Sequence, residues 1–263
     1  MNSGSESRPA AEVCLVVPCY NEAERLDTSA FLYGLEQQPG LRLLFVDDGS
    51  TDTTGPVLEE LRADAPDRIE VLALGENRGK AEAVRRGMLR ALDSSPDYAG
   101  YWDADLATPL GEVPGFVERM RSDSRLELVM GARVKLLGRT IVRNPARHYL
   151  GRIFATCVSI VLRLAVYDTQ CGAKLFRADP ELLEPLFGEP FRSTWIFDVE
   201  ILARLIRRLH ENGGPPVEDV VYEYPLTTWR DIEGSKLTGG DFVRSAWELA
   251  RIWQVYRPRA VRG

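Results

Sequence analysis

The first hundred residues alternate between short apolar runs and longer amphipathic segments, and this alternation limits the fold more than any other feature. The apolar runs have the length of buried strands and occupy residues 13–17, 42–46, 69–74 and 98–102. The segments between them are predicted to be helices at residues 22–38, 53–63 and 80–92. This order predicts an α/β fold, with a parallel sheet, right-handed crossovers and helices on the faces of the sheet.

Polar side chains follow each of the four predicted strands. They are Asn21 with Glu22, Asp47 with Asp48, Asn77 with Arg78, and Asp103 with Asp105. Ligands of open parallel sheets bind outside the carboxyl ends of the strands. Because parallel strands end at one edge, we expect these four groups to surround a single site.

The second half of the chain is less regular. Its apolar runs predict strands at residues 128–130, 173–176 and 217–222 and helices at 145–164, 197–209 and 241–256. Residues 1–11 are small and polar, and we expect them to be disordered. The sequence contains no internal repeat and no low-complexity linker, which favours one domain.

The segment Asp103-Ala104-Asp105 is the main candidate for chemistry. Two carboxylates at a strand end can share a hard divalent cation, Mg²⁺ or Mn²⁺, with a diphosphate. An acidic loop before the next helix is the simpler alternative, because the pattern is short and common. The pair Asp47-Asp48 is a second candidate, since helix capping explains Ser50 but not two adjacent acids. A carboxylate there can accept hydrogen bonds from a nucleobase or a ribose.

Charge is distributed unevenly along the chain. The net charge of −6 argues against a nucleic-acid partner. Residues 128–167 nevertheless contain no acid and carry seven basic residues: Arg133, Lys135, Arg139, Arg143, Arg147, Arg152 and Arg163. This segment is either a solvated basic face or the place where an anionic substrate or membrane surface is bound. The helix predicted at 145–164 is likewise either a core helix or one that lies in a headgroup layer.

No apolar run is long enough to span a bilayer, and the first residues lack the apolar segment of a signal peptide. The four cysteines have no disulfide or metal-ligand spacing, which favours a reducing compartment. We therefore expect a cytoplasmic protein.

Four segments together resemble family 2 glycosyltransferases in order and spacing. They are Pro18-Cys19-Tyr20-Asn21-Glu22, residues 47–52, Asn77-Arg78-Gly79-Lys80 and Asp103-Ala104-Asp105. In the second half, residues 168–174, 195–200 and 229–236 resemble the dolichyl-phosphate glucosyltransferase branch, with the dolichyl-phosphate mannosyltransferases as near neighbours. The resemblance covers residues 12–240.

The resemblance implies an A-type glycosyltransferase fold, with a Rossmann-like, mostly parallel central sheet flanked by helices. It implies one domain over residues 12–240, with a nucleotide-sugar-binding half at 12–105 and an acceptor half at 106–240. Residues 241–263 would form an amphipathic helix and a basic tail. The implied reaction is an inverting, metal-dependent hexose transfer from a nucleotide sugar to a polyprenyl or dolichyl phosphate. UDP-glucose is favoured over GDP-mannose as donor. From the arginines that flank the apolar sides of the predicted helices at 145–164 and 241–256, we expect any membrane contact to be peripheral, on the inner face of a membrane.

The resemblance also assigns roles by motif position. Nucleotide-sugar binding is expected from Pro18, Tyr20, Glu22, Asp47, Asp48, Lys80 and Asp103. The metal ligands would be Asp103 and Asp105, and the acceptor phosphate would meet Arg133 and Arg147. Many mannosyltransferase relatives add a Gln two residues after the Asp-x-Asp motif, where this chain has Ala107. The remaining metal ligands are therefore left open.

Asp198 and Asp105 are the expected catalytic residues. Asp198 would be the base for a hydroxyl acceptor, but an acceptor phosphate is already largely anionic at neutral pH, and Asp198 would then position a sugar hydroxyl. An acid that only stabilises a helix N-terminus is the structural alternative. Gln170, Cys171 and Gly172 are expected to line the pocket, and Lys236 to close over the phosphates.

Three other functions remain to be weighed. A family 2 transferase that uses a polysaccharide or soluble hydroxyl acceptor would need a base and would have no use for Arg133 and Arg147. A nucleotidyltransferase usually has a glycine-rich loop after the first strand, where this chain has Pro18-Cys19-Tyr20. A non-catalytic module that binds nucleotide sugars or a membrane surface would not require Asp103, Asp105 and Asp198 to be intact.

Overall fold

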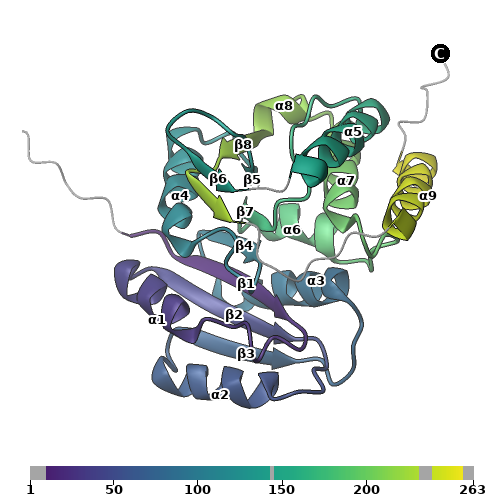
Figure 1. The fold of residues 1–263 in the computed structure, drawn as a ribbon. Helices are drawn as coiled ribbons and strands as arrows, with labels where there is room; N and C mark the ends of the chain where they lie inside the picture. Colours follow the sequence, from purple (N-terminus) through teal and green to yellow (C-terminus); the bar gives the residue numbers. More distant parts are fainter. Residues whose placement is uncertain (1–9, 143–144, 231–238, 257–263) are drawn as a thin grey trace, which may run out of the picture.

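A seven-stranded sheet lies at the centre of the computed structural model, which describes residues 10–142, 145–230 and 239–256 (Figure 1). The strand order is β3–β2–β1–β4–β7–β5–β8. Only β7 runs antiparallel to its neighbours, so the prediction of a mostly parallel α/β sheet is confirmed. The strands are β1 (Val13–Cys19), β2 (Leu41–Asp47), β3 (Ile69–Ala73), β4 (Tyr98–Trp102), β5 (Leu128–Ala132), β7 (Ala173–Arg177) and β8 (Val221–Pro225).

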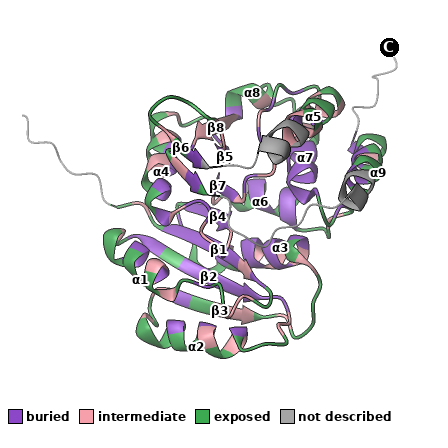
Figure 2. Cartoon of the chain, viewed as in Figure 1, coloured by how far each residue is buried: buried purple, intermediate pink, exposed green. Residues whose placement is uncertain are grey.

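Helices cover both faces of this sheet (Figure 1). Alternate residues of β1 point to opposite faces, because successive side chains of a strand do. Val13, Leu15 and Val17 pack with α1 (Thr28–Gln37), α2 (Thr54–Asp64) and α4 (Val113–Ser122). Cys14 and Val16 share the other core with α3 (Lys80–Ala91), α5 (Pro145–Leu162), α6 (Pro180–Phe187), α7 (Phe197–Glu211) and α9 (Gly239–Tyr256). Figure 2 shows the sheet buried between these layers, with exposed residues on the outer helix faces.

The structure corrects two of the predicted elements. The first helix begins at Thr28 and not at residue 22, because residues 21–23 are bonded to the loop after β2. Residues 217–222 are not one strand: Val217–Val220 form the short helix α8, and the strand β8 begins at Val221. The structure also has a small second sheet that was not predicted, made of β6 (Thr140–Val142) and β9 (Thr228–Arg230).

The strand order reverses at β1, and this reversal creates the opening for a site. β1 has β2 on one side and β4 on the other. The helix after β1 packs on one face of the sheet, while α3, which precedes β4, packs on the other. Gly87 lets α3 lie close to the sheet, since a Cβ there would come within 2.2 Å of Val16 Cγ1. The carboxyl ends of β1 and β4 therefore flank the crevice where ligands bind in folds of this type.

Candidate active site

The loops after β1 and β2 are bonded to each other at this edge. Asn21 has a positive φ of 53°, and its side-chain oxygen accepts a hydrogen bond of 2.8 Å from the Thr51 backbone N–H. In return the Asn21 N–H donates to Ser50 Oγ at 3.0 Å, and the Glu22 N–H donates to Thr54 Oγ1 at 2.8 Å. These bonds explain why residues 21–23 are not helical. They hold Tyr20, which is exposed, and Glu22 beside the carboxyl end of β2.

Two acids, Asp47 as the last residue of β2 and Asp48 directly after it, are nearly buried, and each holds a loop. Asp48 accepts the backbone N–H groups of Arg78 at 2.8 Å and Gly79 at 2.7 Å, one on each carboxylate oxygen. Asp47 Oδ1 accepts the Ser50 N–H at 2.9 Å. Burial raises the pKa of Asp48. Asp48 thus fixes the loop that ends at Gly79, and the next residue, Lys80, begins α3 at the active edge.

The Asp-x-Asp segment directly follows β4. Asp103 forms an ion pair with Lys80, and its backbone N–H donates to Gly172 O at 3.0 Å. Asp105 Oδ1 accepts the Ala107 N–H at 3.0 Å. Gly172 faces the Asp103 carboxylate so closely that a Cβ would lie 1.9 Å from Oδ2. The Asp-x-Asp segment and the turn before β7 are therefore in direct contact, and position 172 has no room for a side chain.

The carboxylates of Glu22, Asp103 and Asp105 lie close enough to one another for their charges to interact. Burial, and next the charge of Asp103, raise the pKa of Asp105. Burial also raises the pKa of Glu22, although its ion pair with Arg25 at 2.7 Å opposes the effect. The Glu22 Oε2 atom is buried and has no hydrogen-bond partner among the described residues. Adjacent carboxylates of this kind favour a bound cation.

Within the described residues, no three His, Cys, Asp or Glu side chains converge into a complete metal site. The pair Asp103 and Asp105 instead fits an ion that takes its other ligands from substrate. Mg²⁺ is commonly held by one or two carboxylates together with phosphate oxygens and water. The residues present thus fit a cation that arrives with a diphosphate.

Asp198 lies at the start of α7 and is held by two side chains from the sheet. Its Oδ1 accepts Tyr101 OH and Lys174 Nζ, each at 2.5 Å. Lys174 is completely buried. No role for Tyr101 or Lys174 was predicted from the sequence. The one signal was a lysine between Ala173 and Leu175 in an apolar strand, where a charge needs a partner.

Arg133 follows β5 and forms a two-pronged ion pair with Asp168. Its Nε lies 2.6 Å from Oδ2 and its Nη2 lies 2.7 Å from Oδ1, and neither bond uses Nη1. The guanidinium also lies 5.2 Å from the centre of the Trp229 ring. Burial largely accounts for the raised pKa of Glu223, which accepts the backbone N–H groups of Tyr167 and Asp168. Arg133 is therefore held in a fixed position by its ion pair with Asp168.

Of the other predicted site residues, some are described by the structure and some are not. Gln170 and Cys171 belong to the turn that precedes β7, and burial raises the pKa of the Cys171 thiol to about 11. That thiol is buried and un-ionised at neutral pH, as a packing residue would be. The side chain of Arg147 and the whole of Lys236 lie outside the described residues.

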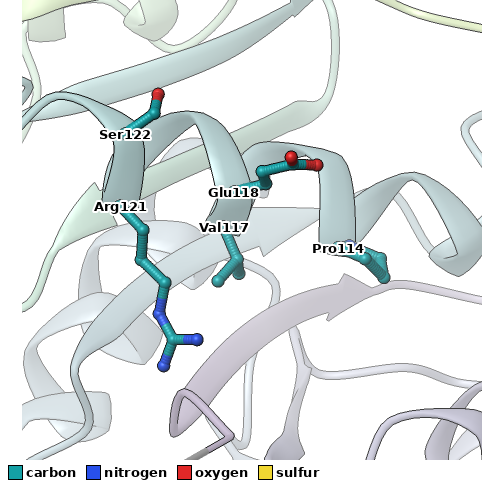
Figure 3. Close-up of a pocket in the computed structure, with 5 residues that line it drawn as sticks. All are labelled: Pro114, Val117, Glu118, Arg121 and Ser122. Carbon is teal, nitrogen blue, oxygen red and sulfur yellow. The ribbon is translucent and has the colours of Figure 1, made fainter. Parts of the chain in front are cut away.

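Two surface hollows lie away from this edge. One, of about 450 Å³, is lined by Pro114, Val117, Glu118, Arg121 and Ser122, all on α4 (Figure 3). The other, of about 350 Å³, includes Arg42 and Ile69 at the beginnings of β2 and β3, opposite the carboxyl ends. Neither includes a predicted site residue.

Comparison with known proteins agrees with this geometry. A family model described as glycosyl transferase family 2 matches residues 14–180. The dolichyl-phosphate beta-glucosyltransferase of Drosophila melanogaster is 32% identical over 269 residues, which is 95% of this chain and 77% of the relative.

Solved structures show the same fold at lower identity. Glucosyl-3-phosphoglycerate synthase from Mycobacterium tuberculosis, solved with Mn²⁺, UDP-glucose and phosphoglyceric acid, is 19% identical with a TM-score of 0.66 and covers 95% of this chain and 82% of that chain. A mannosyltransferase from Pyrobaculum calidifontis, solved with GDP-Man and Mn²⁺, is 20% identical with a TM-score of 0.63. The match covers 93% of this chain and 63% of that chain. The A-type fold predicted from the motifs is confirmed.

Proposed function

The chain belongs to glycosyl transferase family 2, and we propose that it transfers a hexose from a nucleotide-sugar donor to a polyprenyl or dolichyl phosphate. UDP-glucose is the favoured donor and GDP-mannose the second. The observation that carries the proposal is the joint placement of two groups. The Asp103, Asp105 and Lys80 cluster lies at the strand-order reversal, and the turn before β7 connects it to the Arg133–Asp168 pair, in which Asp168 is buried and Arg133 is partly exposed.

The donor half of the proposal rests on the charges at the edge. A divalent cation held by Asp103 and Asp105 would neutralise the charge that develops on the departing nucleoside diphosphate. Lys80 is already paired with Asp103 and can turn toward a phosphate, because its side chain is 44% exposed. Pro18, Tyr20, Glu22 and Asp47 lie at or just after the carboxyl ends of β1 and β2, and in this proposal they contact the nucleoside.

The acceptor half rests on Arg133. A guanidinium that is fixed by Asp168 and packed near Trp229 has lost its rotamer freedom before substrate arrives. Its Nη1 has no hydrogen-bond partner among the described residues and can donate a charge-assisted hydrogen bond to a phosphate oxygen. The acceptor oxygen would attack the anomeric carbon from the face opposite the diphosphate, which inverts that carbon. Arg147 remains part of this proposal by its motif position alone.

Label from UDP-glucose is expected to enter polyprenyl phosphate in the presence of Mn²⁺ or Mg²⁺, and Arg133→Ala is expected to lower the rate by about 10–100-fold through a raised KM for acceptor. The measurement is radioactivity in the organic phase, with GDP-mannose assayed in parallel. The Arg133→Lys variant should transfer sugar at a rate between those of the wild type and Arg133→Ala, because lysine keeps the charge but cannot form the two-pronged bond of a guanidinium.

Arg62→Ala is the matched control, since Arg62 forms an exposed pair with Glu59 at the far end of α2. It should transfer sugar at the wild-type rate. Label that stays in the aqueous phase while the wild type consumes donor would refute the lipid acceptor. It would leave family membership untouched.

The proposal includes contact with a membrane surface through α5 and α9, which are neighbours (Figure 1). The apolar side predicted for α5 is partly buried and partly exposed in the structure. Val158 packs in the core, whereas Ile153 and Ile160 are 62% and 73% exposed. On α9, Trp247 and Trp253 are 63% and 48% exposed. Of the helices in the described part of the chain, none has the length and apolar character needed to cross a bilayer.

Binding to vesicles that contain anionic lipid is expected, and Ile160→Ser with Trp247→Ser should weaken it about tenfold or more, because each change removes apolar area from the contact. Vesicle co-sedimentation at two salt concentrations separates the apolar contribution to binding from the electrostatic one, because salt weakens only the second. Tyr33→Ser is the matched control, since Tyr33 is equally exposed but lies on α1. Equal loss in both variants would contradict a contact through α5 and α9.

A further inference from the structure

The buried lysine of β7 lies behind the candidate catalytic acid without reaching the crevice. We infer that Lys174, with Tyr101, is a positioning residue that fixes Asp198 to accept a hydrogen bond from a hydroxyl of the transferred sugar and prevents it from acting as a base. This inference rests on the proposed function, because a phosphate acceptor is what makes a base unnecessary.

The ammonium group of Lys174 uses all three of its protons within the protein. It donates to Asp198 Oδ1 at 2.5 Å, to Thr169 O at 2.9 Å and to Cys171 O at 2.7 Å. An ammonium has three donors and no acceptor, so this set is complete. Lys174 thereby joins the first turn of α7 to the turn whose Gly172 contacts Asp103.

Tyr101 fixes the same carboxylate oxygen from a second strand. Its hydroxyl donates to Asp198 Oδ1 at 2.5 Å, and its ring packs against Phe176 and Phe197 with centroids 6.3 and 5.9 Å apart. Tyr101 stands two residues before Asp103 on β4. β4, the strand that leads into Asp103-Ala104-Asp105, thus also fixes the position of Asp198. Neither bond uses Oδ2, and no described residue donates a hydrogen bond to it, so that oxygen can accept one from a substrate.

This arrangement suits a hydrogen-bond acceptor better than a base. Protonating Asp198 would leave a neutral acid against a fully buried ammonium, and an uncompensated buried charge is costly. Accepting a hydrogen bond on Oδ2 leaves the ion pair intact. In the transfer, a phosphate oxygen forms a bond to the anomeric carbon as the bond from that carbon to the diphosphate breaks. The electron pair leaves on the diphosphate, and no proton has to be removed from a dianionic phosphate.

Four variants test the inference: Lys174→Met, Asp198→Asn, the double variant with both changes, and Tyr101→Phe. Each single change at 174 or 198 leaves a buried charge unpaired and should lower kcat by about 100-fold or more. The double variant removes both charges and keeps a carbonyl acceptor at 198. Its kcat should recover to within about tenfold of the wild type, a loss of the size expected for one altered hydrogen bond. A folded double variant as inactive as Asp198→Asn would overturn the inference, because a base cannot be replaced by an amide.

Tyr101→Phe supplies a test that does not depend on tolerance of the buried charge. It should lower kcat while the pH dependence of kcat/KM keeps its wild-type shape. If Asp198 acted as a base, removing this hydrogen bond would alter the acid limb of that pH profile, so an altered acid limb would contradict the inference.

Donor binding separates failure of this inference from failure of the proposed function. Lys174→Met should bind UDP-glucose about tenfold more weakly but UDP with unchanged affinity, because Asp198 would contact only the sugar. Calorimetry measures both affinities without any acceptor. A wild type that forms no lipid product would refute the acceptor alone. Equal weakening of UDP and UDP-glucose would refute the role given to Lys174.

Discussion

Asp105→Asn is expected to lower kcat/KM for sugar transfer by about 10³-fold, because in the proposed mechanism Asp105 is a ligand of the cation that stabilises the departing diphosphate. The side chain keeps its shape, and its oxygen can still accept the Ala107 N–H. The loss should therefore come from metal binding and not from a collapsed loop. Steady-state kinetics over a range of Mn²⁺ concentrations, together with calorimetric titration of Mn²⁺ in the presence of UDP, measure the effect.

Asp93→Asn is the control for this change, since Asp93 forms an exposed pair with Arg90 beyond the far end of α3. Surface pairs of this kind contribute little, and activity should be unchanged. An Asp105→Asn protein that binds Mn²⁺ and UDP as tightly as the wild type would show that Asp105 is not a ligand.

The raised pKa of Asp105 adds a pH dependence to the same measurement. Protons compete with the metal for this carboxylate, and they do so at a higher pH than for an ordinary aspartate. Mn²⁺ affinity in the wild type should therefore fall as pH drops through the raised pKa, and recover as pH rises above it.

Gly172→Ala is the second change with a large expected effect, a loss of about 10²-fold in kcat/KM. The added Cβ would lie 1.9 Å from Asp103 Oδ2, so either the carboxylate or the turn before β7 must move. Displacements near 1 Å at a reacting centre cost about 10²-fold in rate. Overpacking of this kind costs only about 1–3 kcal/mol of stability, so the protein should still fold.

Gly111→Ala is the matched control, because a Cβ there would have no neighbour within 4 Å. Kinetics and thermal unfolding of both variants separate lost activity from lost stability. A Gly172→Ala enzyme with wild-type kcat/KM would show that Asp103 tolerates displacement, which would argue against its place in the metal site.

The first four strands and the edge at which they end were predictable because two signals agree. Each strand is an apolar run of strand length, and each is followed by polar residues that have no reason to be buried. The start of α1 was not predictable in this way. Residues 22–27 have a composition that is compatible with a helix. The N–H groups of Asn21 and Glu22, however, donate to the hydroxyls of Ser50 and Thr54, about thirty residues later, and this keeps the start of the stretch out of a helix.

The site was partly predictable for the same reason. The motif acids lie at strand ends, and their positions follow from the topology. The pairing of Arg133 with Asp168 does not, because the sequence shows an acid-free stretch and places the partner one residue beyond it. Lys174 shows the limit most clearly, since its three acceptors come from a turn and a helix that only the folded chain brings together.

The reversed direction of β7 makes the chain cross the active edge in both directions. The chain leaves the parallel strands through the loops that carry Tyr20, Asp48 and Asp105, but it enters β7 from that edge through residues 168–172. Because Gly172 O accepts the Asp103 N–H, this entry turn and the loop after β4 form one unit. In the proposed mechanism a change of acceptor made in the entry turn would therefore require a matching change beside Asp103.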